Sequence, residues 1–251
     1  MTEIRPMVVD LSHWDPAYDY EAVKRDGIVG VIYKATEGQS YTDDTYVGQQ
    51  KAAKAVGLRW GSYHFADASP VGGQIDNYLR FAAPDGDELF CLDWEDNPSG
   101  NGMMPIENVR IWIDEVERAL GREGQCVIYS GNTAKEQIHG VDPFMGARRL
   151  WHAQYGTTPS WQKSWKTYWI WQFTDGEYGP DPHEVDGIGR CDINSYAGTA
   201  EQLLAEWATG SAKPAPEPEP KPDVPEVRIT TTGALNLWVN DECVVSSTRR
   251  G

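Results

Sequence analysis

Two acidic residues, Asp93 and Glu95, follow directly on an apolar run at residues 89–92. The run predicts a buried strand, and because side chains alternate between the faces of a strand, both carboxylates should point the same way. Neighbouring carboxylates repel each other, so one of them should keep its proton to a higher pH than a free carboxyl group. A proton donor beside an anion is what cleavage of a glycosidic bond requires. The alternative is an exposed acidic turn, since an Asp-x-Glu sequence after an apolar run also arises by chance.

Asp10, Lys34 and Asp192 each lie at the end of another predicted strand. In an eight-stranded parallel barrel, catalytic side chains stand at the carboxyl ends of the strands, so these three would meet Asp93 and Glu95 there. The four acids would otherwise be half-buried charges, and Lys34 is the one candidate cation to partner them. A structural salt bridge is the alternative role for Asp10 and Asp192.

Aromatic and amide side chains would complete the rim of this site, namely Tyr63, Tyr129, Trp171 and Gln172. The rim and the Asp-x-Glu spacing favour sugar chemistry. A metal ion held by the four acids is a rival interpretation, because hard cations bind clustered carboxylates. The histidines are too scattered to form a metal site, and we expect neither a metal nor a cofactor.

Alternating strand and helix patterns supply the elements that would position these residues. Strands are expected at residues 7–10, 29–35, 59–66, 89–92, 126–130, 149–154, 168–173 and 190–193, and helices at 20–25, 43–56, 73–82, 105–120, 133–138 and 199–208. Five strand–helix units followed by three strands with few helices predict an irregular TIM-like (β/α) barrel of the α/β class.

Composition narrows the class of function. The 251 residues carry a formal net charge of −16, which argues against a nucleic-acid partner because phosphate binding needs a basic stripe. The 11 Trp and 12 Tyr are unusually many; some will fill the core, and exposed rings often stack on sugars. No apolar run is long enough for a signal peptide or for insertion into a membrane. The cysteines form no CxxC pair, which predicts buried free thiols and a protein made in a reducing cytoplasm; they are Cys91, Cys126, Cys191 and Cys243.

Eight segments, in order along residues 7–207, resemble the family 25 glycoside hydrolases, which are the N-acetylmuramidase lysozymes of phages and bacteria. They are VDLSHW (9–14), YKATEG (33–38), GSYHFA (61–66), LDWEDNPSG (92–100), VIYSG (127–131), LWHAQYG (150–156), WIWQF (169–173) and CDINSY (191–196). The resemblance implies an irregular barrel and a substrate, the β-1,4 bond from N-acetylmuramic acid to N-acetylglucosamine in peptidoglycan. His152 departs from the family pattern, in which an apolar residue is more usual.

The resemblance also implies roles for the acids, with Asp10, Asp93, Glu95 and Asp192 as the acidic site and Glu95 as the general acid. Asp93 could raise the pKa of Glu95, act as a nucleophile, or orient the 2-acetamido group of the substrate. We favour the third role, in which the substrate assists its own cleavage. Attack by water with inversion stays open.

The barrel is expected to occupy residues 1–209. Residues 210–226, in which proline alternates with glutamate and lysine, predict an extended linker that cannot bury a core. Residues 227–251 have β-like character but are too few to fold alone. We interpret them as a fragment of a wall-binding module, with a disordered tail as the alternative.

The function expected from the sequence is that of a cofactor-free, monomeric peptidoglycan hydrolase. Without a signal peptide, it fits a phage endolysin that accumulates in the host cytoplasm and reaches the wall when the membrane is breached. A bacterial lysozyme exported by another route is the alternative origin. Two other functions stay open: a non-catalytic wall-binding protein that keeps the barrel as a sugar platform, and a glycosidase that cuts chitin or the glucosaminidase bond.

Overall fold

The computed structural model describes residues 4–98, 100–207, 227–231, 234–239 and 242–248. The chain divides into two compact units, Met1–Ala215 and Pro216–Gly251. The predicted linker at residues 210–226 lies outside the described residues.

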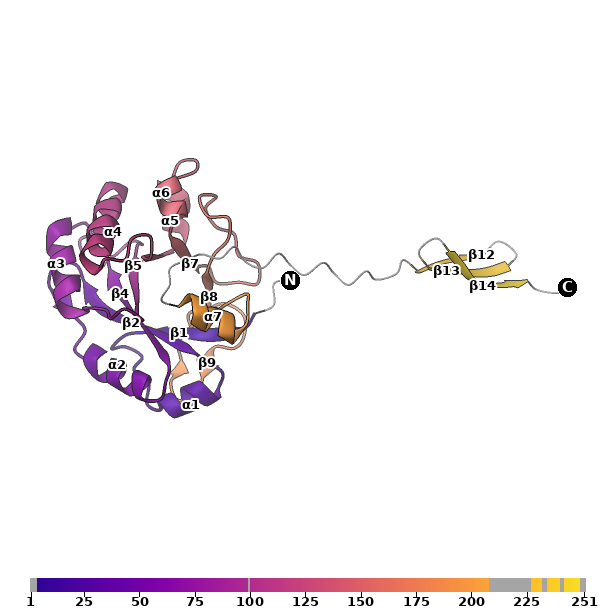
Figure 1. Cartoon of the computed structure of the whole chain (residues 1–251), viewed down its shortest axis with the longest axis horizontal. Coiled ribbons are helices and arrows are strands. Elements are labelled where there is room, and N and C mark those ends of the chain that lie inside the picture. The colour runs from indigo at the N-terminus through magenta and orange to yellow at the C-terminus, as the bar shows by residue number, and fades with distance from the viewer. Residues whose placement is uncertain (1–3, 99, 208–226, 232–233, 240–241, 249–251) are drawn as a thin grey trace. The chain divides into compact units, whose positions relative to one another are not determined.

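Eight strands of the first unit close into a barrel, because β1 pairs with both β2 and β11 at the ends of a continuous ladder (Figure 1). The order around the barrel is β1, β2, β4, β5, β6, β7, β8 and β11. Their bounds are β1 Pro6–Leu11, β2 Gly30–Glu37, β4 Arg59–Phe65, β5 Leu89–Asp93, β6 Val127–Ser130, β7 Arg149–Ala153, β8 Ile170–Thr174 and β11 Asp192–Ser195. The predicted barrel is therefore confirmed. Three short strands lie outside it: β3 Tyr41–Thr42 extends β2, and β9 Glu184–Val185 pairs with β10 Gly189–Arg190.

The last barrel strand differs from the prediction in both position and direction. Residues 190–193 were expected to form a parallel strand with Asp192 at its carboxyl end. Instead Asp192 begins β11, which runs antiparallel to both β8 and β1. Because the direction is reversed, the amino end of β11 lies beside the carboxyl end of β1, and Asp192 still reaches the predicted end of the barrel.

Helices surround the outside of the barrel, and their bounds are α1 Tyr20–Arg25, α2 Tyr46–Ala55, α3 Val71–Phe81, α4 Ile106–Leu120, α5 Asn132–Gln137, α6 Pro143–Gly146 and α7 Ala200–Glu206 (Figure 1). In α4 the apolar side chains of Val109, Trp112, Ile113 and Val116 recur at helical spacing and are fully buried. The helix ends at Gly121, whose positive φ of 64° is the left-handed conformation that favours glycine at this position. None of the helices in the described part of the chain is long and apolar enough to span a membrane.

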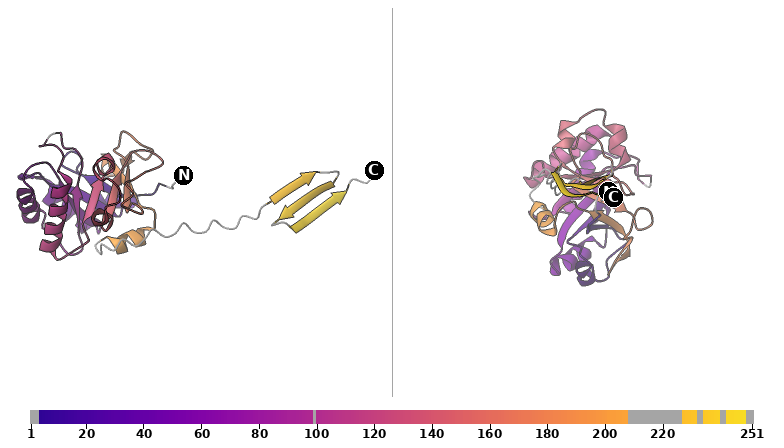
Figure 2. Two further views of the ribbon diagram at one scale, coloured as in Figure 1. Left: turned by 90° about the horizontal axis from the view of Figure 1, so that it is seen from above. Right: turned by 90° about the vertical axis from the view of Figure 1, so that its right-hand side faces the viewer.

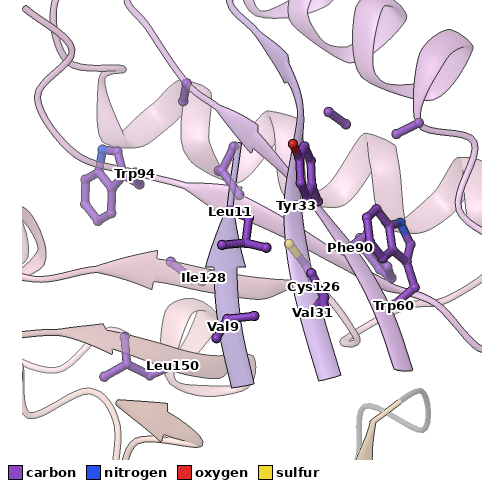
Figure 3. Packing of buried hydrophobic residues seen from close by; sticks show 14 of the residues in the cluster. Val9, Leu11, Val31, Tyr33, Trp60, Phe90, Trp94, Cys126, Ile128 and Leu150 are labelled. Atoms are coloured by element: carbon purple, nitrogen blue, oxygen red, sulfur yellow. The ribbon is translucent and has the colours of Figure 1, made fainter. Parts of the chain in front are cut away.

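Alternation along the barrel strands divides the buried side chains into two layers. In β5, Phe90 and Leu92 belong to a large cluster that includes α4 residues, and this cluster fills the space between strands and helices (Figure 3). Leu89 and Cys91 belong to a second cluster, with Val127 of β6, which fills the barrel interior. Residues that face the interior therefore lead directly up to the acidic end of the barrel.

The opposite end of the barrel is closed by the residues that end α7. Trp207 is fully buried in the interior cluster, and its Nε1 donates to the backbone oxygen of Trp60 at 2.9 Å. Arg149, at the start of β7, donates from Nη1 to the backbone oxygen of Glu206 at 2.8 Å. A methyl group at Gly30, where β2 begins, would overlap the indole ring of Trp207. The chain thus needs glycine at this position to close the barrel.

The second unit holds three antiparallel strands, β12 Val227–Thr231, β13 Ala234–Val239 and β14 Glu242–Thr248, which lie side by side in Figure 2. These strands lie within the segment 227–251, for which β-like character was expected.

Candidate active site

Asp10 and Asp192 face each other as register partners in β1 and β11. Asp10 accepts hydrogen bonds from Nδ2 of Asn194 at 2.6 Å and from Nε2 of Gln172 at 2.9 Å. Burial raises the pKa of Asp10 to about 7, against the lowering effect of these donors. Burial, and then repulsion by Asp10, raises the pKa of Asp192 well above its usual range. The two carboxyls also hydrogen-bond to each other, so the pair retains a proton at a pH at which free carboxyls are ionised.

Asp93 and Glu95 form the second acidic pair, at the end of β5. Asp93 is 7% exposed, and its Oδ1 is buried without a hydrogen-bond partner among the described residues. Burial, and then repulsion by Glu95, raises the pKa of Asp93 well above its usual range. Burial raises the pKa of Glu95 to about 7, with a further contribution from the charge of Asp96. This pair can therefore hold one proton and one negative charge near neutral pH.

Lys34 supplies positive charge beside these acids. Its Nζ lies 2.5 Å from Oε2 of Glu37, and Oε1 of Glu37 accepts a hydrogen bond from Nδ2 of Asn97 at 2.9 Å. Lys34 acts to lower the pKa of Asp93, against the larger effect of burial. Because Asn97 lies two residues beyond Glu95, the carboxylate of Glu37 ties the cation to the loop that carries the second acidic pair.

A bulge in β2 makes this contact possible. Strict alternation would put Lys34 and Glu37 on opposite faces of the strand, but the register with β4 shifts between Lys34 and Thr36. Ala35 packs in the outer cluster, and Oγ1 of Thr36 lies 2.7 Å from Nδ1 of His64, which is fully buried behind the barrel. Two successive residues thus face outward, and Glu37 returns to the side of Lys34.

Tyr63, Tyr129 and Gln172 reach the same end of the barrel. Tyr129 donates from its hydroxyl to Oε1 of Gln172 at 2.9 Å, and its ring centroid lies 4.6 Å from that of Trp151. Burial, and then repulsion by Asp93 among other acids, raises the pKa of Tyr63 well above its usual range. Burial, and then repulsion by acids of this end of the barrel, likewise raises the pKa of Tyr129. Both phenols are therefore neutral hydrogen-bonding groups among the acids.

The structure does not bring Trp171 to this group. Trp171 lies between Ile170 and Gln172 in β8. The side chains of Ile170 and Gln172 point into the barrel interior, so that of Trp171 points outward. Trp171 is fully buried in the outer cluster, where its Nε1 donates to the backbone oxygen of Gln154 at 2.7 Å. A rim that used both Trp171 and Gln172 conflicts with the alternation of neighbouring side chains along a strand.

Three residues that contribute to the site were not predicted from the sequence, namely Asn194, Glu37 and Asn97. Asn194 could have been found from the sequence, because it lies two residues beyond Asp192 and so on the same face of the strand. Glu37 could not, because the bulge cancels the alternation that spacing implies. Asn97 follows β5 in a loop, for which the sequence carries no periodic signal.

Among the side chains that the structure describes, no three His, Cys, Asp or Glu residues are grouped so that they could hold a metal ion. The arrangement offers a carboxyl that holds a proton near pH 7, neighbouring carboxylates, one cation and two neutral phenols. Such a set can protonate a leaving oxygen and stabilise positive charge that develops beside it.

Comparison with known proteins gives concordant matches. The family model "Glycosyl hydrolases family 25" matches residues 9–181. Lysozyme M1 of Streptomyces globisporus is 31% identical over 215 residues, which span 78% of this chain and 69% of that protein. The autolytic lysozyme of Clostridium acetobutylicum is 29% identical over 193 residues, 75% of this chain and 55% of that protein. The crystal structure of a bacterial lysozyme from Streptomyces coelicolor superposes with a TM-score of 0.70 at 27% identity, over 83% of this chain and all of that one.

Proposed function

The chain belongs to the family 25 glycosyl hydrolases, and we propose that it cleaves the β-1,4 bond from N-acetylmuramic acid to N-acetylglucosamine in peptidoglycan. It is a glycoside hydrolase of the muramidase type. The observation that carries the proposal is the pair Asp93 and Glu95, in which burial of both carboxyls and the repulsion of Asp93 by Glu95 keep a proton near neutral pH.

In this proposal Glu95 is the proton donor. It is more exposed than Asp93, so a bound glycosidic oxygen can reach it. Its pKa of about 7 makes it both largely protonated below neutral pH and acidic enough to release the proton. As the bond from the anomeric carbon to the leaving oxygen breaks, the proton of Glu95 passes to that oxygen.

Asp93 would orient the 2-acetamido group of the sugar. Asp93 keeps 7% of its surface exposed, and in this proposal its carboxylate accepts a hydrogen bond from the amide N–H. That bond favours the ionised form of Asp93 and so moves the shared proton to Glu95. The acetamido oxygen then attacks the anomeric carbon, and water later opens the cyclic intermediate while Glu95 recovers a proton.

Asp10 and Asp192 would hold the sugar rather than react with it. Asp10 already accepts two side-chain hydrogen bonds, from Asn194 and Gln172, and is almost fully buried. Asp192 is more exposed and shares a proton with Asp10, so it can donate to a hydroxyl or to the acetamido oxygen. Lys34, Tyr63 and Tyr129 would complete the contacts with the substrate.

Mass spectrometry of borohydride-reduced fragments tests the bond that is cut, after incubation of the protein with purified peptidoglycan. Reduced muramic acid at the new ends is the expected result, and the Glu95→Gln protein should release about a hundredfold to ten-thousandfold less. Reduced glucosamine at the new ends would show that the protein cuts the glucosaminidase bond and not the proposed one. No new ends on several wall types, together with wall binding by both proteins, would favour a non-catalytic binding protein.

We further propose that the enzyme is an endolysin, held in the host cytoplasm until the membrane is breached. The three described cysteines, Cys91, Cys126 and Cys191, are buried free thiols, which suits folding in a reducing compartment. Bacteria that express the protein should remain intact until a pore-forming agent is added and then lyse, whereas cells that express Glu95→Gln should not. Lysis without the agent would instead indicate export.

A further inference from the structure

The loop between β1 and α1 presents an indole ring to solvent. Trp14 is 83% exposed, whereas tryptophans such as Trp60, Trp112 and Trp151 are almost fully buried. Tryptophan has the largest apolar area of any side chain, so leaving it in water forfeits a large hydrophobic gain. An indole that is held in this exposed position by its loop therefore points to a ligand.

Hydrogen bonds fix this loop in place. The backbone N–H of His13 donates to Oδ2 of Asp43 at 2.9 Å, and Asp43 is fully buried. The backbone N–H of Ser12 donates to Oδ2 of Asp15 at 2.7 Å, and that of Trp14 donates to Oγ of Ser12 at 3.2 Å. The loop is thus held both to the segment beyond β3 and to itself, so binding to Trp14 would cost little ordering of the backbone.

A row of rings connects Trp14 with the acidic site. The ring of His13 lies 4.5 Å from that of Trp14 and 6.0 Å from that of Tyr41, and the Tyr41 hydroxyl is 3.0 Å from Nδ1 of His13. Lys34 Nζ lies 5.3 Å from the centre of the Tyr41 ring, and the same ammonium acts on the pKa of Asp93. The exposed indole therefore belongs to a surface that continues from the cleavage site.

We propose that Trp14, supported by His13 and Tyr41, is a stacking platform for a hexopyranose ring of the glycan strand that lies more than two rings from the cleaved bond. This inference rests on the proposed function. The C–H groups on one face of a pyranose are apolar and carry a partial positive charge, which suits the electron-rich face of an indole. The ring edges leave hydroxyl groups free for water.

The observations favour a glycan over other occupants of this surface. The row of rings leads to the acids that would cleave the strand, so one extended ligand can contact both. An anionic membrane surface is disfavoured, because the chain carries a formal net charge of −16. A protein partner would need a wider apolar area than Trp14 and the two rings beside it provide.

The test compares hydrolysis of a tetrasaccharide and an octasaccharide prepared from peptidoglycan, with kcat/KM measured for each. Trp14→Ala should lower kcat/KM on the octasaccharide about tenfold and leave the tetrasaccharide unchanged, because only the longer strand reaches the platform. Trp14→Phe keeps an aromatic face and should retain most of the activity. Ile111→Ala, which removes an exposed apolar side chain from α4 on the outside of the barrel, is the matched control and should behave as wild type.

Two results would overturn the platform. In the first, kcat/KM of Trp14→Ala on the octasaccharide equals that of wild type. In the second, Trp14→Ala lowers kcat/KM equally on both substrates, which would mean that the substitution acts on the acidic centre or on folding. Calorimetric binding of the octasaccharide, with and without Trp14→Ala in the Glu95→Gln background, gives an independent measure. If wild type cleaves neither substrate, the proposed function fails, and the binding data then decide: weaker binding on loss of the indole supports the platform, and unchanged binding rejects it.

Discussion

At the scale of single residues, the burial that keeps a reactive proton on the acidic site also lowers the stability of the fold at neutral pH. Carboxyl groups normally ionise well below neutral pH, but burial raises the pKa of both Asp10 and Glu95 to about 7. A carboxyl whose pKa is higher in the folded state than in the unfolded state favours folding at low pH. That contribution is lost as the pH rises through the folded-state pKa.

Relative to wild type, Glu95→Gln should therefore stabilise the protein increasingly as the pH rises from about 4.5 to about 7, with the full effect above that range. Between the ordinary glutamate pKa of 4.5 and the folded value of about 7, the free energy of unfolding of wild type falls, because the folded state holds a proton that the unfolded state has released. The loss is about 3 kcal/mol at most for a shift of this size. Glutamine does not ionise, so the Glu95→Gln protein does not lose this free energy of unfolding.

Thermal unfolding of both proteins at about pH 4 and about pH 8 measures this effect. The melting temperatures should agree at the lower pH, and the variant should melt higher at the upper pH. Equal melting temperatures at both values would mean that Glu95 is better solvated than its burial implies.

At the scale of elements, the bulge in β2 controls the electrostatics of the site. It brings Glu37 to Lys34, and Glu37 also binds Asn97. Glu37 is thus a positioning residue that binds the ammonium of Lys34 and offsets part of its charge. Glu37→Gln should free the charge of Lys34 to act on Asp93 and Glu95 and so lower the pKa of the pair.

The pH profile of kcat/KM reports this shift. The alkaline limb of Glu37→Gln should move to lower pH, because the proton donor ionises sooner, while Lys34→Met should move the same limb to higher pH. A role for Glu37 in folding alone would lower the rate without displacing the limb. Displacement of both variants in the same direction would contradict the electrostatic role.

The packing at the closed end of the barrel predicts the effect of substituting Gly30, with Gly48 of α2 as a control. Gly30→Ala places a methyl group against the indole of Trp207, which is buried and hydrogen-bonded to the backbone of Trp60, and should cost about 1–3 kcal/mol of unfolding free energy. Gly48→Ala is the matched control, because Gly48 lies in α2 with nothing within 4 Å of the added group. It should stabilise by about 0.5–1 kcal/mol, since alanine favours helix.

Denaturant titration distinguishes these outcomes, with kcat/KM measured beside it. Because Gly30 lies at the end of the barrel away from the acids, the fraction that is folded should remain active. A stable Gly30→Ala protein would mean that the last turn of α7 can shift without opening the interior.

Local signals in the sequence located most elements correctly. The side chain of Asp19, directly before α1, caps this helix by accepting a hydrogen bond from the backbone N–H of Ala22 at 3.1 Å. Gly121 follows directly on the helical pattern expected at residues 105–120, and it ends α4. These features depend on residues a few positions apart, for which propensity and capping are informative.

Features that depend on pairing between distant strands were missed. The last strand was expected at residues 190–193 and parallel to the others, but pairing with β1 and β8 places its start at Asp192 and reverses its direction. Trp171 was placed in the site although its neighbour Gln172 points there. The bulge at Ala35 likewise arises from the register between β2 and β4. Register is decided by the partner strand, and the sequence of one strand does not contain it.

At the scale of the whole molecule, charge governs the encounter with the wall. The formal net charge of −16 repels other anions over a distance set by the salt concentration. Cleavage of intact anionic walls should therefore become faster as salt rises from about 10 to about 150 mM, while cleavage of a short, uncharged oligosaccharide should not change. Turbidity of wall suspensions and release of oligosaccharide measure the two rates. Equal responses would show that the repulsion acts within the site itself.

The pairing of β1 with β11 also bears on when activity arises during synthesis. The hydrogen bond from Asn194 to Asp10 joins residues 184 positions apart, and closing so long a loop is slow compared with forming local contacts. A nascent chain on the ribosome can build the earlier strands and helices while Asp10 still lacks both of its neighbours on β11. The acidic site is therefore completed only when the last barrel strand has emerged and docked, and an unfinished chain lacks it.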